Sequence, residues 1–236
     1  MSANEAERRK LILERLEKAY PQAKVALHFS NPWELLVAVV LSAQCMDIVV
    51  NKATEKLFAK YKTLDDYVNA PPQTFEKELT SIIFYRNKAK NILASAKIVK
   101  ERHEGKVPDT MEELLKLPGV ARKTANIILG NAYGKVEGIA VDTHVSRISQ
   151  RLRLVELETI GGKQELTFVR KGKTVLDFKK DADPVKIEAQ LMERLPKEKW
   201  FATTYRIIDH GRAICKAQNP KCEICPLSDL CPTSRV

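Results

Sequence analysis

Apolar residues recur at spacings of three and four along most of the chain, which is the pattern of helices with one buried face. Residues 33–44 differ because they are almost uniformly apolar, as expected of a helix at the centre of its domain, and Asn31-Pro32 favours a helix start just before them. The pattern predicts further helices over residues 6–19, 48–60, 64–68, 72–80, 86–103, 111–115, 121–132, 143–152, 184–194 and 199–215. The chain is therefore predicted to be all-α.

One segment departs from the helical pattern. Residues 166–170 and 174–178 are rich in β-branched and aromatic residues, and Lys171-Gly172-Lys173 lies between them. This arrangement predicts a β-hairpin with glycine in its turn. We interpret residues 161–180 as an insertion and expect it to be a solvated excursion, with a basic tip that is a candidate contact for a nucleic-acid backbone. No period of 20–50 residues repeats, so a solenoid is not indicated.

Composition narrows the class of protein. With 44% hydrophobic residues among 236, the chain has enough apolar surface for a packed core. The longest uncharged apolar stretch, residues 35–45, is too short to cross a bilayer, and residues 1–24 do not resemble a secretion signal. We expect a cytoplasmic monomer with no membrane partner, associated with the nucleoid if bacterial. The net charge of +10 predicts affinity for polyanions such as nucleic acid, although a merely soluble basic protein would also fit.

The cysteines suggest a metal site. Four of the five crowd near the C-terminal end, whereas disulfide scaffolds distribute cysteines to staple long loops. Their Cys-x6-Cys-x2-Cys-x5-Cys spacing lacks the two close pairs of a structural zinc site, so it favours a four-iron cluster while leaving zinc as the alternative. These four cysteines are Cys215, Cys222, Cys225 and Cys231. The fifth, Cys45, is expected to be a buried small apolar residue.

Two short motifs carry candidate chemistry. The run LPGVARKTA over residues 117–125 joins two predicted helices by a glycine-containing turn. The free N–H groups and positive dipole end of the second helix would suit a phosphate, although an ordinary helix–turn–helix corner would look similar. The run VDTHVSR over residues 141–147 places Asp142 where a helix N-cap belongs. A capping role and a catalytic role for Asp142 are compatible.

These motifs follow LSAQ at residues 41–44 and Asp47, and they precede the four cysteines. In that order they resemble the endonuclease III family, the bifunctional DNA glycosylases of the helix-hairpin-helix superfamily. The resemblance covers nearly the whole chain except the insertion. It implies a six-helix bundle carrying the hairpin over residues 25–135, and a domain holding a [4Fe–4S] cluster built from residues 1–24 and 136–236, with the insertion at about 161–180.

The resemblance also implies a function and its residues. The activity would be removal of oxidised pyrimidines, such as thymine glycol and 5-hydroxycytosine, from double-stranded DNA, with strand cleavage 3′ to the abasic site. Lys123 matches the family's nucleophile, and its place in the first turn of a helix favours the neutral amine. Asp142 matches the essential carboxylate, which either assists proton transfer or stabilises charge on the sugar. The four C-terminal cysteines match the cluster ligands.

DNA contacts are implied at further positions. Gln44 lies in the DNA-filling region, and Phe84 aligns with an apolar plug, although Phe84 could instead be a core residue. Ile83 and Ala121 stand where relatives usually have glycine, which puts the backbone of both turns in question. The remaining contacts implied by the resemblance are Leu117, Gly119, Ala121, Arg122, His144, Arg147, Arg212, Lys216 and Lys221.

Two rival functions make different demands on the sequence. The adenine-removing mismatch glycosylases of the same fold carry a glutamate in the helix before LSAQ and lack the hairpin lysine. Here residues 37–40 are Val-Ala-Val-Val and Lys123 is present, so that activity is disfavoured. A non-catalytic DNA-binding module would need neither Lys123 nor Asp142.

Overall fold

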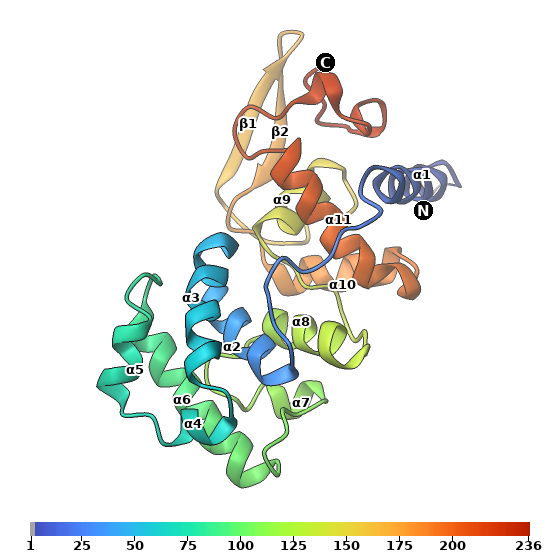
Figure 1. The fold of residues 1–236 in the computed structure, drawn as a ribbon. Helices are drawn as coiled ribbons and strands as arrows, with labels where there is room; N and C mark the ends of the chain where they lie inside the picture. Colours follow the sequence, from blue (N-terminus) through green and yellow to red (C-terminus); the bar gives the residue numbers. More distant parts are fainter. Residues whose placement is uncertain (1–2) are drawn as a thin grey trace. The chain divides into compact units, whose positions relative to one another are not determined.

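The computed structural model describes residues 3–236, which divide into two compact units (Figure 1). One unit is Val25–Glu137, and the other combines the N-terminal residues up to Lys24 with Gly138–Val236. The helical elements and the one hairpin confirm the predicted fold class. No helix within residues 3–236 has the length and apolar character needed to cross a membrane.

The unit Val25–Glu137 is a helical bundle arranged around α2. Its helices are α2 (Pro32–Ser42), α3 (Asp47–Lys60), α4 (Leu64–Val68), α5 (Pro72–Glu78), α6 (Tyr85–Arg102), α7 (Met111–Leu114) and α8 (Arg122–Tyr133). The Asn31 side chain caps α2 by accepting a hydrogen bond from the Glu34 N–H, and Pro32 occupies the first turn. Helix α2 contacts α3, α6 and α8. Its uniformly apolar sequence is therefore explained by neighbours on several sides.

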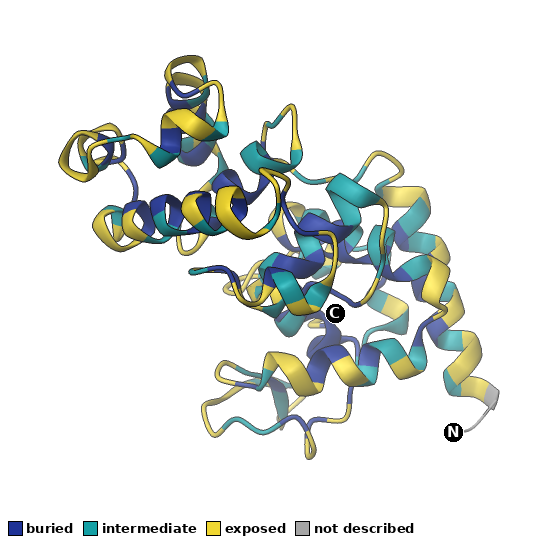
Figure 2. Cartoon of the chain, turned by 90° about the horizontal axis from the view of Figure 1, so that it is seen from below, coloured by how far each residue is buried: buried dark blue, intermediate teal, exposed yellow. Residues whose placement is uncertain are grey.

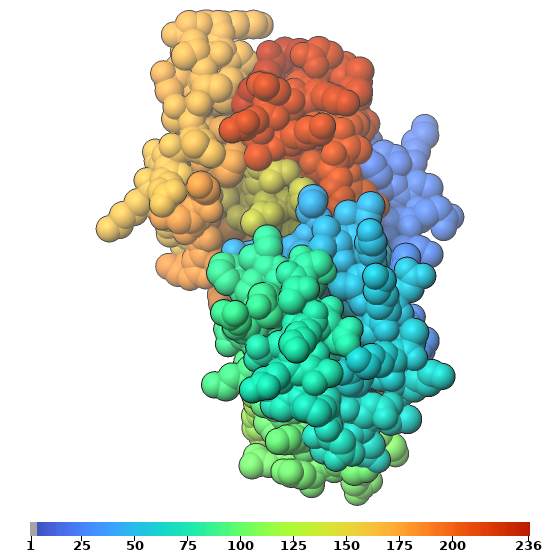
Figure 3. Space-filling view, turned by 60° about the vertical axis from the view of Figure 1, so that its left-hand side comes forward, coloured from blue at the N-terminus to red at the C-terminus, as the bar shows by residue number. Residues whose placement is uncertain are grey.

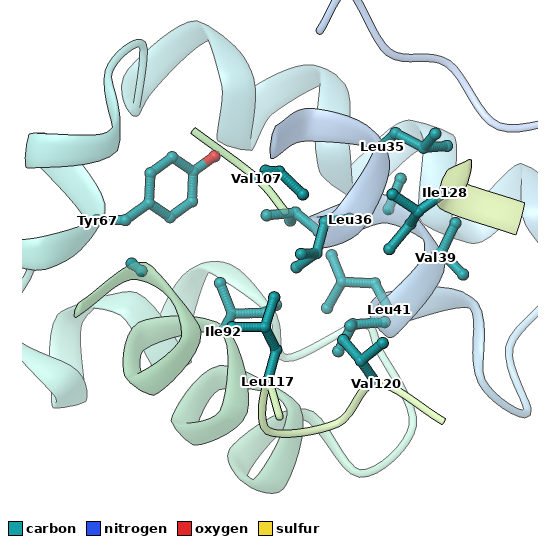
Figure 4. Close-up of a cluster of buried hydrophobic side chains, with 14 of the residues drawn as sticks. Leu35, Leu36, Val39, Leu41, Tyr67, Ile92, Val107, Leu117, Val120 and Ile128 are labelled. Carbon is teal, nitrogen blue, oxygen red and sulfur yellow. The ribbon is translucent and has the colours of Figure 1, made fainter. Parts of the chain in front are cut away.

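The core of this unit forms where α2 meets α6 and α8. Every residue from Leu35 to Leu41 is buried. Figure 4 shows Leu36 and Leu41 of α2 among Ile92 of α6 and Ile128 of α8. Leu117 and Val120, from the turn before α8, belong to the same cluster (Figure 4). Their packing against the apolar core therefore holds that turn in place.

The second unit has α11 (Trp200–Ala213) packed against both α1 (Ala3–Ala19) and α9 (Thr143–Arg151). Figure 2 shows helices with one buried and one exposed face, as the spacing of apolar residues predicts. The helix α10 (Pro184–Arg194) is capped by Asp183. The short 3-10 turns are η1 (Lys197–Lys199), η2 (Cys222–Ile224) and η3 (Ser228–Leu230). The last two of these turns lie in the cysteine-rich segment, which runs from Cys215 to Cys231.

The predicted hairpin is present as β1 (Glu165–Arg170) and β2 (Lys173–Lys179), which pair antiparallel. Its turn residues Lys171 and Gly172 both have positive φ angles. The expectation of a solvated excursion is wrong for β2, because Asp177 and Phe178 are buried and the strand contacts α9. The turn residues and most of β1 are exposed, and burial is confined to the second half of β2.

Candidate functional site

The glycine-containing turn presents the start of α8. Gly119 adopts φ +82°, a left-handed conformation that glycine accepts without a side-chain clash. Ala121 is the N-cap with φ −95° and ψ 171°, which is ordinary extended backbone. Its departure from glycine therefore costs nothing. Because Ala121 brings no side-chain cap, the first N–H groups of α8 remain suited to an anion.

Lys123 lies in the first turn of α8, and its side chain is exposed. Arg122, beside it, is half-buried. The prediction that Leu117 contacts DNA needs correction, because its side chain is 2% exposed and belongs to the core. Its N–H donates to the Leu114 carbonyl and its carbonyl accepts from the Val120 N–H, so Leu117 holds the turn in place.

We expect Gly119→Ala to destabilise the protein by about 1–3 kcal/mol, because a non-glycine residue would be held in the left-handed region. An added Cβ would also lie 3.0 Å from Asn91 Nδ2. The matched variant Ala121→Gly should change stability by only a few tenths of a kcal/mol, since glycine is tolerated at an N-cap. Melting temperatures of the two variants would test this, and equal melting temperatures would contradict it.

Asp142 is the N-cap of α9, where its Oδ1 accepts a hydrogen bond of 2.7 Å from the Val145 N–H. The side chain is half-buried. The capping role is thus present, and it uses one of the two carboxylate oxygens. Lys123 belongs to the unit Val25–Glu137 and Asp142 to the other unit.

Arg147 was expected to contact DNA, but its guanidinium is buried and already engaged. It donates 2.9 Å to the Cys215 carbonyl and lies 3.2 Å from His144 Nδ1. Burial lowers the pKa of Arg147 below its usual value. We therefore reassign the Arg147 side chain from a DNA contact to a tie between α9 and the start of the cysteine-rich segment. His144 is half-buried beside it.

Gln44 and Phe84 are both exposed at the surface of their unit. Gln44 is exposed with φ 56°, and Phe84 is 64% exposed with φ 57°. The alternative that Phe84 is a core residue is thereby excluded. The left-handed backbone falls on Phe84 and not on Ile83, so isoleucine at position 83 is tolerated. Cys45 is half-buried against the core, and not fully buried as predicted.

Lys88 is a positioning residue that the sequence analysis missed. Its ammonium is buried and donates to the carbonyls of Leu41, at 2.8 Å, and Ala43, at 2.6 Å. Burial lowers its pKa. These bonds satisfy the end of α2 and fix the chain just before Gln44. The available signal was that Lys88 shares the apolar face of α6 with Ile92.

The four C-terminal cysteines surround one pocket. Their thiols are free, and apolar side chains that include Ile148 and Leu227 line the rest of it. Within residues 3–236, no group of three or more His, Cys, Asp or Glu side chains is arranged to hold a single metal ion. Four thiols that line one pocket supply the four thiolate ligands that a multi-iron cluster takes.

The polar neighbours of this pocket also suit thiolates. Arg151 donates 3.3 Å to Cys215 Sγ, His210 Nε2 lies 3.7 Å from Cys225 Sγ, and Thr233 Oγ1 lies 3.4 Å from Cys231 Sγ. Burial raises the pKa of the Cys225 thiol to about 11, so iron coordination would be what deprotonates it. The basic residues Arg212, Lys216 and Lys221 are all exposed nearby in the sequence.

Comparison with known proteins identifies the family. Residues 37–167 match the HhH-GPD superfamily of base excision DNA repair proteins, and residues 215–231 match the iron–sulfur binding domain of endonuclease III. Endonuclease III of Bacillus subtilis is 44% identical over 219 residues, covering 93% of this chain and 89% of that protein. The chain belongs to the endonuclease III family. Endonuclease III of Synechocystis is 42% identical over 233 residues, which cover 99% of this chain and 95% of that protein.

Solved structures of endonuclease III have the same fold as this chain. A trapped endonuclease III–DNA covalent intermediate in its estranged-adenine complex matches with a TM-score of 0.83 and 41% identity, covering 96% of this chain and 95% of that one. As a member of this family, the protein is a bifunctional DNA glycosylase and AP lyase of base excision repair, and it carries a [4Fe–4S] cluster. The predictions of family, enzyme class and cofactor are confirmed.

Proposed function

We propose that this protein removes oxidised pyrimidines of the thymine glycol and 5-hydroxycytosine type from duplex DNA and then cuts the strand 3′ to the abasic site. The observation that carries the proposal is Lys123, an exposed amine in the first turn of α8 immediately after the Gly119 turn. A phosphate bound at the N-terminal end of α8 would bring the sugar of a flipped nucleotide toward the same helix end.

The chemistry follows from an amine at that place. The neutral Lys123 nitrogen attacks C1′ of the damaged nucleotide, and the bond to the base breaks with its electron pair leaving on the base. The attached nitrogen then loses a proton, and the C1′–O4′ bond breaks with its electron pair going to O4′, which takes up a proton. The sugar ring is thereby opened to a protonated imine, which acidifies the C2′ proton. Loss of that proton forms a C2′–C3′ double bond while the C3′–O bond breaks and the phosphate leaves. Water then hydrolyses the imine and returns the free amine. Asp142 would assist a proton transfer or stabilise positive charge on the sugar.

Base eversion leaves a gap in the duplex that side chains can fill. Gln44 and Phe84 suit that role, because each is exposed and has a left-handed backbone conformation. Phe84 offers an aromatic face on which an unpaired base can stack, an interaction worth about 1–3 kcal/mol. Lys88 supports the Gln44 side by holding the carbonyls before it.

The [4Fe–4S] cluster would be ligated by the thiolates of Cys215, Cys222, Cys225 and Cys231. Neither base removal nor elimination is a net oxidation or reduction, so these steps are assigned to this chain's own side chains. The cluster supplies a stable framework for the segment that carries Lys216 and Lys221.

Incision assays on a panel of duplexes test the proposal. Duplexes with thymine glycol, 5-hydroxycytosine, a preformed abasic site, an adenine–guanine mismatch and no lesion would be compared. We expect incision of the first three only, with an unsaturated aldehyde at the 3′ end and a phosphate at the new 5′ end. Release of adenine without strand cleavage would contradict the proposal and favour a mismatch glycosylase.

We expect neutralisation of Lys216 and Lys221 to weaken DNA binding for all sequences. If each contacts one phosphate, the double variant Lys216→Gln/Lys221→Gln should reduce the slope of log affinity against log salt by about one unit per lost contact. The matched control Lys10→Gln/Lys18→Gln removes the same charge from exposed positions on α1. Equal slopes in the two double variants would remove Lys216 and Lys221 from the interface.

A further inference from the structure

The inserted hairpin makes a buried ion pair with α9. Asp177 of β2 receives two hydrogen bonds from the Arg151 guanidinium, each of 2.7 Å, one to each carboxylate oxygen. Both side chains are at least 95% buried. The pair is bidentate, so it fixes the orientation of the guanidinium as well as its position. Phe178 adds a second constraint, since its ring centre lies 5.1 Å from the Arg151 guanidinium carbon.

The same guanidinium reaches the first cysteine. Arg151 donates hydrogen bonds to Cys215 Sγ at 3.3 Å, to the Lys216 carbonyl at 2.7 Å and to the Ala217 carbonyl at 3.0 Å. The Arg151 guanidinium therefore binds the hairpin through Asp177 and also binds the start of the cysteine-rich segment through Cys215, Lys216 and Ala217. A carboxylate on the insertion thus acts on a cysteine sulfur through a single intervening side chain.

The hairpin also contacts the residues that directly follow the cysteine-rich segment. Arg170 of β1 donates 2.6 Å to the Ser234 carbonyl and 3.2 Å to the Pro232 carbonyl. Arg235 lies over the Phe168 ring at 4.9 Å and 3.5 Å from an oxygen of Asp177. Figure 3 shows the hairpin lying beside the C-terminal segment. The insertion thus braces the cysteine-rich segment at both ends.

We propose that the inserted hairpin is a positioning element of the iron–sulfur site, in which Asp177 orients Arg151 so that its guanidinium donates a hydrogen bond to the sulfur of Cys215. Hydrogen bonds to cysteine sulfurs and the local net charge set the reduction potential of iron–sulfur clusters, and outer partners of this kind also govern metal retention. The hairpin therefore helps to set the cluster's potential and slows its loss of iron. The inference rests on the proposed ligation by Cys215.

Two variants separate the contribution of charge from that of the hydrogen bond. Asp177→Asn leaves the Arg151 charge uncompensated beside the sulfur, so the more reduced cluster is stabilised and the potential rises. The double variant Arg151→Met/Asp177→Leu removes both charges together, so the local net charge is unchanged while the Arg151 hydrogen bonds to Cys215 Sγ and to the Lys216 and Ala217 carbonyls are lost. Its potential should fall below that of the parent protein. Replacing a buried ion pair by apolar residues of similar size is often tolerated, which keeps the double variant foldable.

The test is protein-film voltammetry on the purified holoprotein, together with the rate of iron release to a chelator. We expect shifts of about tenfold in the equilibrium constant between cluster oxidation states, which is about 59 mV for one electron, upward for Asp177→Asn and downward for the double variant. Iron release should be faster in the double variant. The matched control Glu165→Gln neutralises an exposed carboxylate on β1 and should leave both quantities unchanged.

The proposal would be overturned if the double variant had the same reduction potential as the parent protein, even if its iron release were faster. Faster iron release alone would show only that the fold is looser. A colourless parent protein without absorption near 400 nm would instead refute the ligation by cysteine on which the inference rests. Incision of thymine glycol is measured separately, so failure of the repair function is distinguishable from failure of this inference.

Discussion

Lys123→Gln is expected to lose strand cleavage at thymine glycol by roughly 10⁴-fold or more, the order seen when a covalent nucleophile is removed. Glutamine has no amine to attack C1′, so no imine forms and the C2′ proton is not acidified. The residue is exposed at the start of α8, so folding should be unaffected. Single-turnover incision rates with saturating enzyme measure the effect without interference from binding.

The matched control is Lys135→Gln, which removes the same charge just beyond the opposite end of α8. Lys135 pairs with Asp109 on the surface, and exposed pairs of this kind contribute about 0–1 kcal/mol. Its incision rate should stay within twofold of the parent. If Lys123→Gln instead cut thymine glycol duplex as fast as Lys135→Gln, the nucleophile would be a different residue.

Asp142→Asn is expected to reduce incision by about 10²–10⁴-fold while the fold remains intact. Asparagine keeps the oxygen that accepts the hydrogen bond from the Val145 N–H, and it caps helices about as well as aspartate. It lacks the negative charge and the basicity that proton transfer or charge stabilisation requires. The variant thus separates the capping role from the catalytic role, which the sequence left joined.

Asp183→Asn is the matched control for this substitution. Asp183 caps α10 in the same unit by accepting from the Val185 N–H at 2.9 Å, and it has no assigned part in the chemistry. Both asparagine variants should melt within a few degrees of the parent, and only Asp142→Asn should lose incision. An active Asp142→Asn would reduce that aspartate to a helix cap.

Most helices could be predicted from the sequence because the spacing of apolar residues along the chain is a local signal. The helix predicted over residues 33–44 is present as far as Ser42, since a run that is apolar on every side has only the centre of a bundle to occupy, but Ala43 and Gln44 lie outside it and are exposed. The hairpin was recognisable from its period and its Gly172 turn, yet its burial was not. Asp177 is buried because Arg151, 26 residues earlier, meets it, and no local pattern reports such a partner.

The candidate site shows the same division. Motifs placed Lys123 and Asp142 on helix starts, because a glycine turn and an N-cap are local signals. They could not tell that Arg147 is occupied by the carbonyl of Cys215, 68 residues away. Lys88 was overlooked for a related reason. Its place on the apolar face of α6 indicates burial, but the carbonyls that pair with it, those of Leu41 and Ala43, lie 47 and 45 residues earlier in the chain.

Borohydride trapping followed by peptide mapping tests the central claim most directly. The parent protein would be mixed with thymine glycol duplex, the imine reduced with borohydride, and the adduct digested and sequenced by mass spectrometry. The account predicts one covalent protein–DNA adduct, with the sugar attached to the ε-nitrogen of Lys123. An adduct on another lysine, or incision without any trapped adduct, would contradict it.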